Sequence, residues 1–286
     1  MGTMTRASLI VAVIVLLAGC GSDGGDLANV INQGNATFKV LDLTSGAVSY
    51  KQSISDLTTN PAYGDTLMVF RRVATGGDTL GSPVSEFGHQ ASEPQFAASI
   101  DQFYIGVFEV TTAQWQRLAG TTPWTSVTPE SVIGWSAFTG ATPACNLSAD
   151  DVTAACASFS SGYPWNLTLP TSPQWEFAAR AGTDTEFSWG SSTAVGTVGN
   201  YAVIRETNID ALSNRRLVGP QEVGSHSPNP IGLFDVHGNV WELTSDGDAR
   251  GGSWSDPVAM ARSASAIAVP SSSPQAKVGV RLVLVE

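Results

Sequence analysis

Charged side chains are scarce in this sequence. Asp, Glu, Lys and Arg together make up 14% of the 286 residues, against about a quarter in an ordinary globular protein. The net charge is -11, and no run of Lys and Arg interrupts the acidic excess. A chain without a basic surface cannot replace the counterions of nucleic acids, which excludes nucleic-acid binding. Gly, Ser, Thr and Pro fill the gap and favour a loop-rich α+β domain over a helical bundle.

Long hydrophobic runs are also lacking, apart from one near the amino terminus. Leu9 to Gly19 reads LIVAVIVLLAG and ends at Cys20. The run is too short for a mature membrane span but has the length of a signal-peptide core. The stretch LLAGC resembles the bacterial lipobox. We therefore expect a lipoprotein signal peptide at 1–19 and a lipidated Cys20 at the start of a flexible tether, 20–36.

The lipobox resemblance implies a place in the bacterial cell envelope. Lipidated at Cys20, the protein would be anchored to a membrane by its lipid, at the outer membrane, the periplasmic face or the cell surface. The alternative is an ordinary secretory signal in which Cys20 is incidental.

Cysteine is nearly absent, with three in the whole chain. Once Cys20 is set aside, only Cys145 and Cys156 remain. An exported protein folds in an oxidising compartment, where two such thiols can form a disulfide. The alternative is two separate buried thiols, because a Cys156 two turns into a helix can lie too far from Cys145 to bridge.

Residues 37–286 have the pattern of one domain of short mixed strands and about three helices. Each helix has a capping residue at its start. The first is predicted to begin at Thr111 with Gln114 and to end at Gly120, the second to begin at Ser148, and the third to begin at Thr171 with Gln174 and to end at Gly182. Strands are expected at Asp101–Val110 and in the closing stretch KVGVRLVLVE.

Four segments occur in a recognisable order: FYIGVFEVTTAQWQRL, LPTSPQWEFAARAG, VGSHSPNPIGLFDVHGNVWELTSD and RGGSW followed by VGVR. Together they resemble the formylglycine-generating enzyme, or sulfatase-modifying factor, family. The resemblance implies an irregular single domain related to the C-type lectin fold. It covers roughly residues 60 to 286.

The sequence departs from the family at its oxidase site. The resemblance implies two cysteines that hold copper(I), but those positions are Asp256 and Ala261, and no cysteine follows Cys156. Copper(I) prefers soft sulfur to carboxylate oxygen. Copper and formylglycine synthesis by the known route are therefore not expected, and no catalytic residue is assigned.

The resemblance also implies calcium. The family's site maps onto Asp235 and Glu242 as side-chain ligands and onto Gly238 and Val240 as backbone carbonyl ligands. Oxygens at this spacing can wrap a hard cation. The alternative is a loop whose acids bind backbone amides without a metal. A second family site would begin at Asn200 and Tyr201, but Asn214 and Arg215 stand where its later acid belongs.

These observations predict a lipid-anchored, non-catalytic domain that calcium stabilises and that acts as a binding or structural module. A ligand groove is expected around Ser253, Trp254, Asp256 and Arg262, within the small, polar tract 255–277, which suits a protein or glycan ligand. The alternatives are a formylglycine-generating-type oxidoreductase that acts on protein cysteine, or an accessory factor of an exported system.

Overall fold

The computed structural model describes residues 35–126, 138–209 and 216–286. Contacts divide the chain into two units, Met1–Ile31 and Asn32–Glu286, and every element below belongs to the second. Its helices and strands are mixed irregularly along the chain, which confirms the predicted α+β class. No helix in these described ranges is long and apolar enough to cross a membrane.

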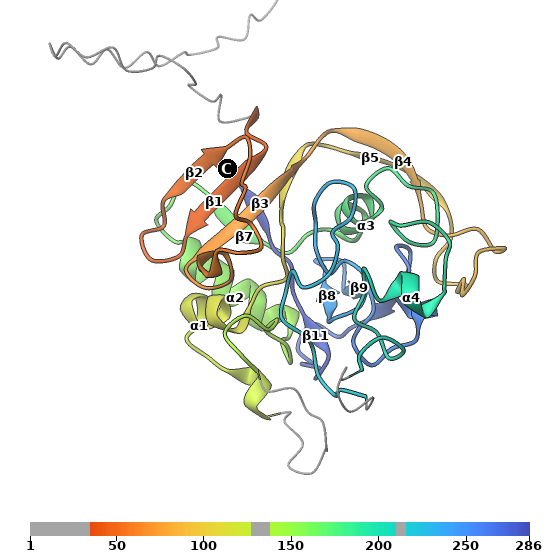
Figure 1. Ribbon diagram of the computed structural model, residues 1–286. Coiled ribbons are helices and arrows are strands. Elements are labelled where there is room, and N and C mark those ends of the chain that lie inside the picture. Colours follow the sequence, from red (N-terminus) through yellow and green to blue (C-terminus); the bar gives the residue numbers. More distant parts are fainter. Residues whose placement is uncertain (1–34, 127–137, 210–215) are drawn as a thin grey trace, which may run out of the picture. The chain divides into compact units, whose positions relative to one another are not determined.

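A six-stranded antiparallel sheet joins the first strands of the domain to its last. The strand order is β2-β1-β3-β6-β12-β7. β12 lies between β6 and β7, and the residues just before it, Val280, Arg281 and Leu282, are fully buried. Figure 1 shows the sheet's first strands, β1 to β3, near its last, β7. The strands are β1 (Phe38–Asp42), β2 (Val48–Lys51), β3 (Leu67–Val73), β6 (Phe103–Gly106), β7 (Asn166–Thr168) and β12 (Val283–Val285).

A second sheet carries the GNVWEL segment. Its order is β10-β9-β8-β11, with β8 and β11 parallel. Because Trp241 of β8 pairs with Val278 of β11, the residues that follow β11 lie next to β8. The strands are β8 (Trp241–Leu243), β9 (Asp248–Arg250), β10 (Ala266–Ala268) and β11 (Val278–Gly279).

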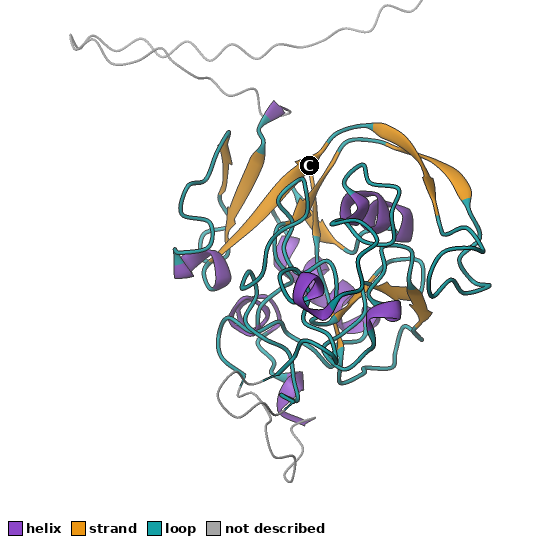
Figure 2. Ribbon diagram, turned by 45° about the vertical axis from the view of Figure 1, so that its right-hand side comes forward, coloured by secondary structure: helices purple, strands orange, loops and turns teal. Residues whose placement is uncertain are grey.

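The remaining strands, β4 (Gly76–Leu80) and β5 (Phe96–Ile100), form an antiparallel ribbon. This ribbon arches over helix α3 in both views (Figures 1 and 2). The strand predicted at Asp101–Val110 is shorter, because only β6 is regular there. The next residues stay buried, and Val107 and Val110 donate backbone hydrogen bonds to Val69 and Val280 instead.

The three predicted helices are confirmed. α1 (Thr112–Ala119) begins with a capping box of Thr111 and Gln114, α2 (Ala149–Ser160) is capped by Ser148, and α3 (Ser172–Arg180) begins with a second capping box. At the end of α3 the left-handed C-cap is Ala181, with φ 51°, one residue before the predicted Gly182. Short helical turns occur at α4 (Val195–Val198), η2 (Pro61–Gly64), η3 (Pro123–Ser126) and η4 (Val258–Met260).

The largest core cluster packs α1 and α2 against strands of both sheets. It includes Trp115 from α1, Val152 from α2 and Trp241 from β8. Trp175 of α3 belongs to a second cluster under β6 and β12. Both Trp175 and Trp241 are 1% exposed, so the two tryptophans are core residues. Trp241 begins β8 just after the loop that carries the candidate site, and Trp175 donates a hydrogen bond to Glu242 of the same strand.

Candidate functional site

The loop before β8 reverses direction within a few residues. Asp235, Gly238 and Asn239 all have positive φ angles, of 57°, 85° and 57°. Position 238 requires glycine for two reasons. Its φ angle is positive, and a Cβ there would clash with the carbonyl oxygen of Val203, at 2.2 Å. The next residue, Asn239, donates its backbone N–H to that same oxygen at 2.8 Å. The loop is therefore seated directly on the chain at Val203.

Three buried carboxylates gather around this loop. Asp235 accepts a hydrogen bond from the backbone N–H of Gly224 at 2.7 Å. Glu109 accepts from the backbone N–H of Val240 at 3.1 Å and from the side-chain amide of Asn239 at 2.6 Å. Glu242 lies close enough to contribute to the electrostatics of both. All three are at most 3% exposed.

Burial raises the pKa values of two carboxylates in this cluster. Desolvation raises the pKa of Asp235 to about 6. Desolvation, with the neighbouring charges of Asp235 and Glu242, raises the pKa of Glu109 well above its ordinary value. The charged forms are therefore disfavoured wherever no cation compensates them.

Arg281, just before β12, supplies that cation. Its Nη2 lies 2.6 Å from Oε1 of Glu242 and its Nε lies 2.8 Å from Oε2. The remaining guanidinium hydrogens go to backbone carbonyls of Gly106, Val107 and Phe234. The indole of Trp175 donates a third hydrogen bond to Glu242, at 2.5 Å. Both oxygens of Glu242 are thus engaged within the protein.

Asp256 is held by three donors. The indole Nε1 of Trp241 donates to Oδ2 at 2.8 Å, and the ammonium of Lys277 lies 2.9 Å from Oδ1. The hydroxyl of Ser253 donates to Oδ2 as well. This carboxylate therefore connects β8, the RGGSW segment and the chain before β11.

Ala261 is fully buried, and its backbone carbonyl accepts a hydrogen bond from Nδ1 of His237 at 2.7 Å. The other ring nitrogen, Nε2, accepts the backbone N–H of Ser188 at 3.1 Å. One nitrogen donates and the other accepts, which defines a neutral imidazole. Burial lowers the pKa of His237 to about 4, so the ring is neutral at physiological pH. Its two hydrogen bonds link the backbone at Ala261 to the backbone at Ser188.

Comparison with known proteins identifies the domain. The "Sulfatase-modifying factor enzyme 1-like domain" family matches residues 61–285. The chain belongs to this family.

Curated relatives of this sulfatase-modifying-factor domain are formylglycine-generating enzymes. That of Mycobacterium tuberculosis is 37% identical over 83 residues, which are 27% of this chain and 26% of the relative. That of Bos taurus is 22% identical over 219 residues, 61% of this chain and 56% of the relative. The match thus spans from about a quarter to about half of the relatives' length.

Solved structures share the fold. The Treponema denticola variable protein 1 has a TM-score of 0.62 at 19% identity, over 78% of this chain and 97% of that protein. PvdO from Pseudomonas aeruginosa has a TM-score of 0.63 at 20% identity, over 76% of this chain and 94% of that protein. At these identities the likeness concerns the fold alone.

The family's calcium ligands do not fit the ion as they lie. Asp235 lies close enough to Glu242 for their charges to interact, but Glu242 already has Arg281 and Trp175 on its two oxygens. No group of three or more His, Cys, Asp or Glu side chains in the described ranges is arranged to hold a metal. Calcium could bind the predicted set only by displacing Arg281, so the calcium that the resemblance implies conflicts with this ion pair.

The second calcium position lies beside aromatic side chains. The Tyr201 ring stacks on Trp189 with centroids 5.1 Å apart, whereas the ligand that the resemblance implies is the Tyr201 backbone carbonyl. The exposed Asn200 accepts the backbone N–H of Ser227 at its carbonyl. Positions 214 and 215, where the later acid belongs, lie outside the described residues.

The positions of the oxidase cysteines do not fit copper(I). Asp256 offers oxygen, which Trp241 and Lys277 already engage, and Ala261 offers a methyl group. The donor set therefore lacks the sulfur that the ion prefers.

The predicted ligand groove needs correction at two residues. Ser253 and Arg262 are both 0% exposed, so neither can line an open groove. Arg262 forms ion pairs with Glu86 at 2.7 Å and Glu93 at 2.9 Å, and it ties the loop between β4 and β5 to the chain after η4. Trp254 and Asp256 are partly exposed.

The predicted disulfide is not formed. Cys145 and Cys156 are both buried free thiols in the core cluster that joins α1 and α2. Cys156 lies well inside α2, whereas Cys145 precedes that helix. Burial raises the pKa of each thiol to about 12, so both stay protonated at neutral pH.

Two residues of the cluster escaped the sequence analysis. Glu109 lies 126 positions before Asp235 and carries no spacing signal. Arg281 belongs to the VGVR segment, but no sequence spacing predicts that it pairs with Glu242. The contact of Glu109 with Val240 and that of Arg281 with Glu242 join segments that are brought together only when the chain folds.

Proposed function

We propose that this protein is an envelope lipoprotein whose sulfatase-modifying-factor domain is a non-catalytic binding or structural module. The observation that carries the proposal is the chemistry at positions 256 and 261. A carboxylate and a methyl group stand where the family resemblance implies two thiols. Neither can form the sulfur bonds that hold copper(I) or engage a substrate cysteine.

The surroundings of these two positions support a structural role. Trp241, Ser253 and Lys277 converge on Asp256, and His237 binds the carbonyl of Ala261. A partly buried carboxylate that accepts hydrogen bonds from separate segments stabilises their arrangement. The remaining thiols, Cys145 and Cys156, are buried with raised pKa values, and reactive cysteines have the opposite properties.

Membrane anchoring through Cys20 is supported by the sequence alone. The apolar run at 9–19 and the LLAGC stretch have the form of a lipoprotein signal, and the following residues form a polar tether. Anchored in this way, the domain would face the periplasm or the cell exterior. Metabolic labelling with a radioactive fatty acid tests this part, with Cys20→Ser as the control that should lose the label.

Recognition of a protein or glycan would use the exposed loops. In the tract 255–277, residues 261–265 are buried, whereas 270–276 are almost wholly exposed. The exposed part reads PSSSPQA, and its hydroxyls and amide can form hydrogen bonds to a polar ligand. The proposed contact surface is therefore narrower than the tract that the sequence predicts.

The decisive experiment offers the purified protein a peptide with the cysteine motif of sulfatases, together with copper and oxygen. We expect the peptide to keep its original mass and copper(I) to bind without defined stoichiometry. The double variant Asp256→Cys with Ala261→Cys is the matched control and should gain tight copper(I) binding. Conversion of the peptide cysteine to an aldehyde by the unaltered protein would establish the oxidoreductase instead.

A further inference from the structure

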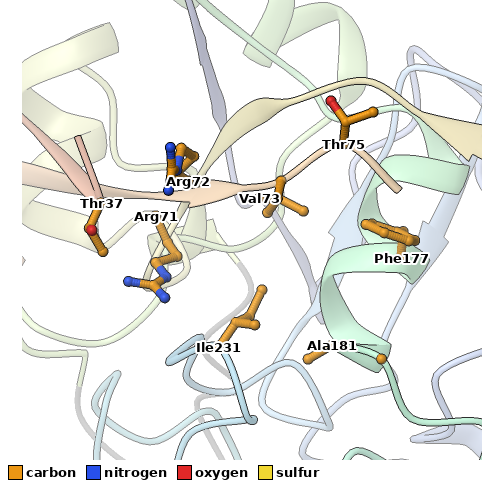
Figure 3. Close-up of a pocket in the computed structure, with 10 residues that line it drawn as sticks. Thr37, Arg71, Arg72, Val73, Thr75, Phe177, Ala181 and Ile231 are labelled. Carbon is orange, nitrogen blue, oxygen red and sulfur yellow. The ribbon is translucent and has the colours of Figure 1, made fainter. Parts of the chain in front are cut away.

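A cavity of about 340 Å³ lies beside the end of β3, away from the carboxylate cluster. It is bounded by the β3–β4 connection, the end of α3 and the loop at Ile231 (Figure 3). Apolar side chains make up much of its wall, and two arginines from β3 border it. The residues that matter below are Arg71, Arg72, Val73, Phe177, Ala181 and Ile231.

Arg71 differs from the buried arginines of this domain. Arg180, Arg250, Arg262 and Arg281 each form an ion pair with a glutamate. Arg71 is partly buried, and no ion pair involves it within the described residues. Its Nε is buried, with no hydrogen-bond acceptor in that part of the chain. A buried donor without an acceptor is costly, and such cases call for an explanation.

Among the residues that the structure describes, the surroundings of this guanidinium contain positive charge but no compensating negative charge. Desolvation and the neighbouring charge of Arg72 lower the pKa of Arg71, and no carboxylate raises it. Arg72 itself donates to the side-chain oxygen of Asn35 at 3.3 Å. The Phe38 ring lies 5.0 Å from the Arg71 guanidinium carbon and braces it as a cation–π partner. In a chain of net charge -11, this is a locally cationic cavity.

The carbonyl groups at the end of α3, which borders the cavity, already accept hydrogen bonds and therefore repel a bound anion less. Carbonyl groups at a helix end carry partial negative charge. The side-chain amide of Asn229 donates to the carbonyls of Ala178 and Ala179, at 2.8 and 3.1 Å. The backbone N–H of Thr183 donates to the carbonyl of Arg180. Three of the last carbonyls are therefore satisfied, and Ala181 adds only a methyl group to the wall.

We propose that this cavity is a binding site for a small organic acid, a carboxylate joined to an apolar ring or branched chain. The carboxylate would accept hydrogen bonds from the two terminal nitrogens of Arg71, which lines the cavity. The apolar part would pack against Phe177 and Ile231. The planar fork of a guanidinium matches a carboxylate in this way. The volume lies at the small end of the range for ligand sites, which suits a single ring.

The site is separate from the carboxylate cluster and does not depend on whether the domain is catalytic. None of the cavity's residues belongs to the positions of the family's calcium or copper ligands. The ligand class follows from one guanidinium without an acceptor and from the apolar wall opposite it.

The test uses phenylacetate and its neutral analogue phenylacetamide with the purified full-length protein. We expect phenylacetate to bind at millimolar concentration or below by ligand-observed NMR and calorimetry. Phenylacetamide should bind at least about tenfold more weakly, because it cannot form the charged pair. Equal binding of acid and amide, or no binding of the acid, would overturn the proposal without any variant.

Two variants locate the site. Arg71→Met should weaken phenylacetate binding about tenfold or more, whereas Arg205→Met, at an exposed arginine paired with Glu206, should leave it unchanged. Ile231→Trp should weaken binding by filling the cavity while Arg71 is kept. Circular dichroism verifies that each variant is folded. Undiminished binding in folded Arg71→Met, or in folded Ile231→Trp if the first variant does not fold, would place the acid elsewhere and refute the assignment.

Discussion

Arg281 and Glu242 form a two-pronged ion pair sealed from solvent, with nitrogen–oxygen distances of 2.6 and 2.8 Å. The pair joins the chain before β12 to β8, and thereby joins the two sheets. It also provides positive charge at the point where three carboxylates meet. The loop that resembles a calcium site is therefore neutralised in part by a residue of the protein.

Breaking this pair should destabilise the fold strongly. Arg281→Met leaves Glu242 charged and buried, and we expect the free energy of unfolding to fall by about 3–5 kcal/mol. The control is Arg117→Met, which breaks an exposed ion pair with Asp65 and should cost at most about 1 kcal/mol. Urea unfolding of both variants measures the difference. Similar losses would show that Arg281 contributes little beyond a surface contact.

Calcium offers a second way to neutralise the same cluster. With Arg281 on Glu242, we expect the unaltered protein to have the same melting temperature in excess calcium and in EDTA. Calcium that binds only the folded state would stabilise it by about 2.7 kcal/mol at a hundredfold excess over Kd and would therefore raise the melting temperature. A calcium-dependent rise that Glu242→Gln abolishes would establish the family's site, with Arg281 displaced.

Gly238 and Gly247 form a matched pair of glycines. Both have φ of +85°, but a Cβ at Gly238 would lie 2.2 Å from the Val203 carbonyl, whereas Gly247 has nothing within 4 Å. Gly247→Ala should cost only the left-handed backbone penalty of about 1–2 kcal/mol. Gly238→Ala should cost clearly more, because the loop must move off Val203. Thermal unfolding compares the two, and equal losses would mean that the loop can shift freely.

His237 predicts a pH dependence of stability. Its pKa is about 4 in the fold, against 6.5 ordinarily, because it is buried. Between these values an unfolded His237 binds more protons than the folded one, so the contribution of this residue to stability falls as the pH decreases through this window. The contribution is on the order of 3 kcal/mol. His237→Gln should flatten the dependence between pH 7 and 5, and an unchanged slope would contradict the assignment.

The two core thiols should resist chemical modification. Burial raises both pKa values to about 12, so neither Cys145 nor Cys156 should react with a thiol reagent at neutral pH in the folded protein. In denaturant without reductant, both should react completely, with Cys20→Ser as the background so that only these two are counted. A denatured, unreduced protein without reactive thiols would reveal the disulfide that the spacing allowed.

The helices and their ends could be predicted from the sequence because their causes are local. Thr111 with Gln114, and Thr171 with Gln174, form the capping boxes that their spacing predicts. Capping depends on residues three positions apart and needs no distant partner. The order of motifs likewise identified the family, and the residues at 256 and 261 predicted the loss of its sulfur chemistry without any structure.

The partners of the buried charges were decided by tertiary structure. Glu242 has the spacing of a metal ligand, but the parallel pairing of β8 with β11 brings Arg281 to it. Arg262 belongs to a polar tract, yet Glu86 and Glu93, about 170 positions earlier, enclose it. A buried charge needs a counter-charge nearby in space, and the fold can bring that partner from any distance along the chain. Spacing therefore predicts which residues can bind a cation, whereas packing determines which of them are already neutralised.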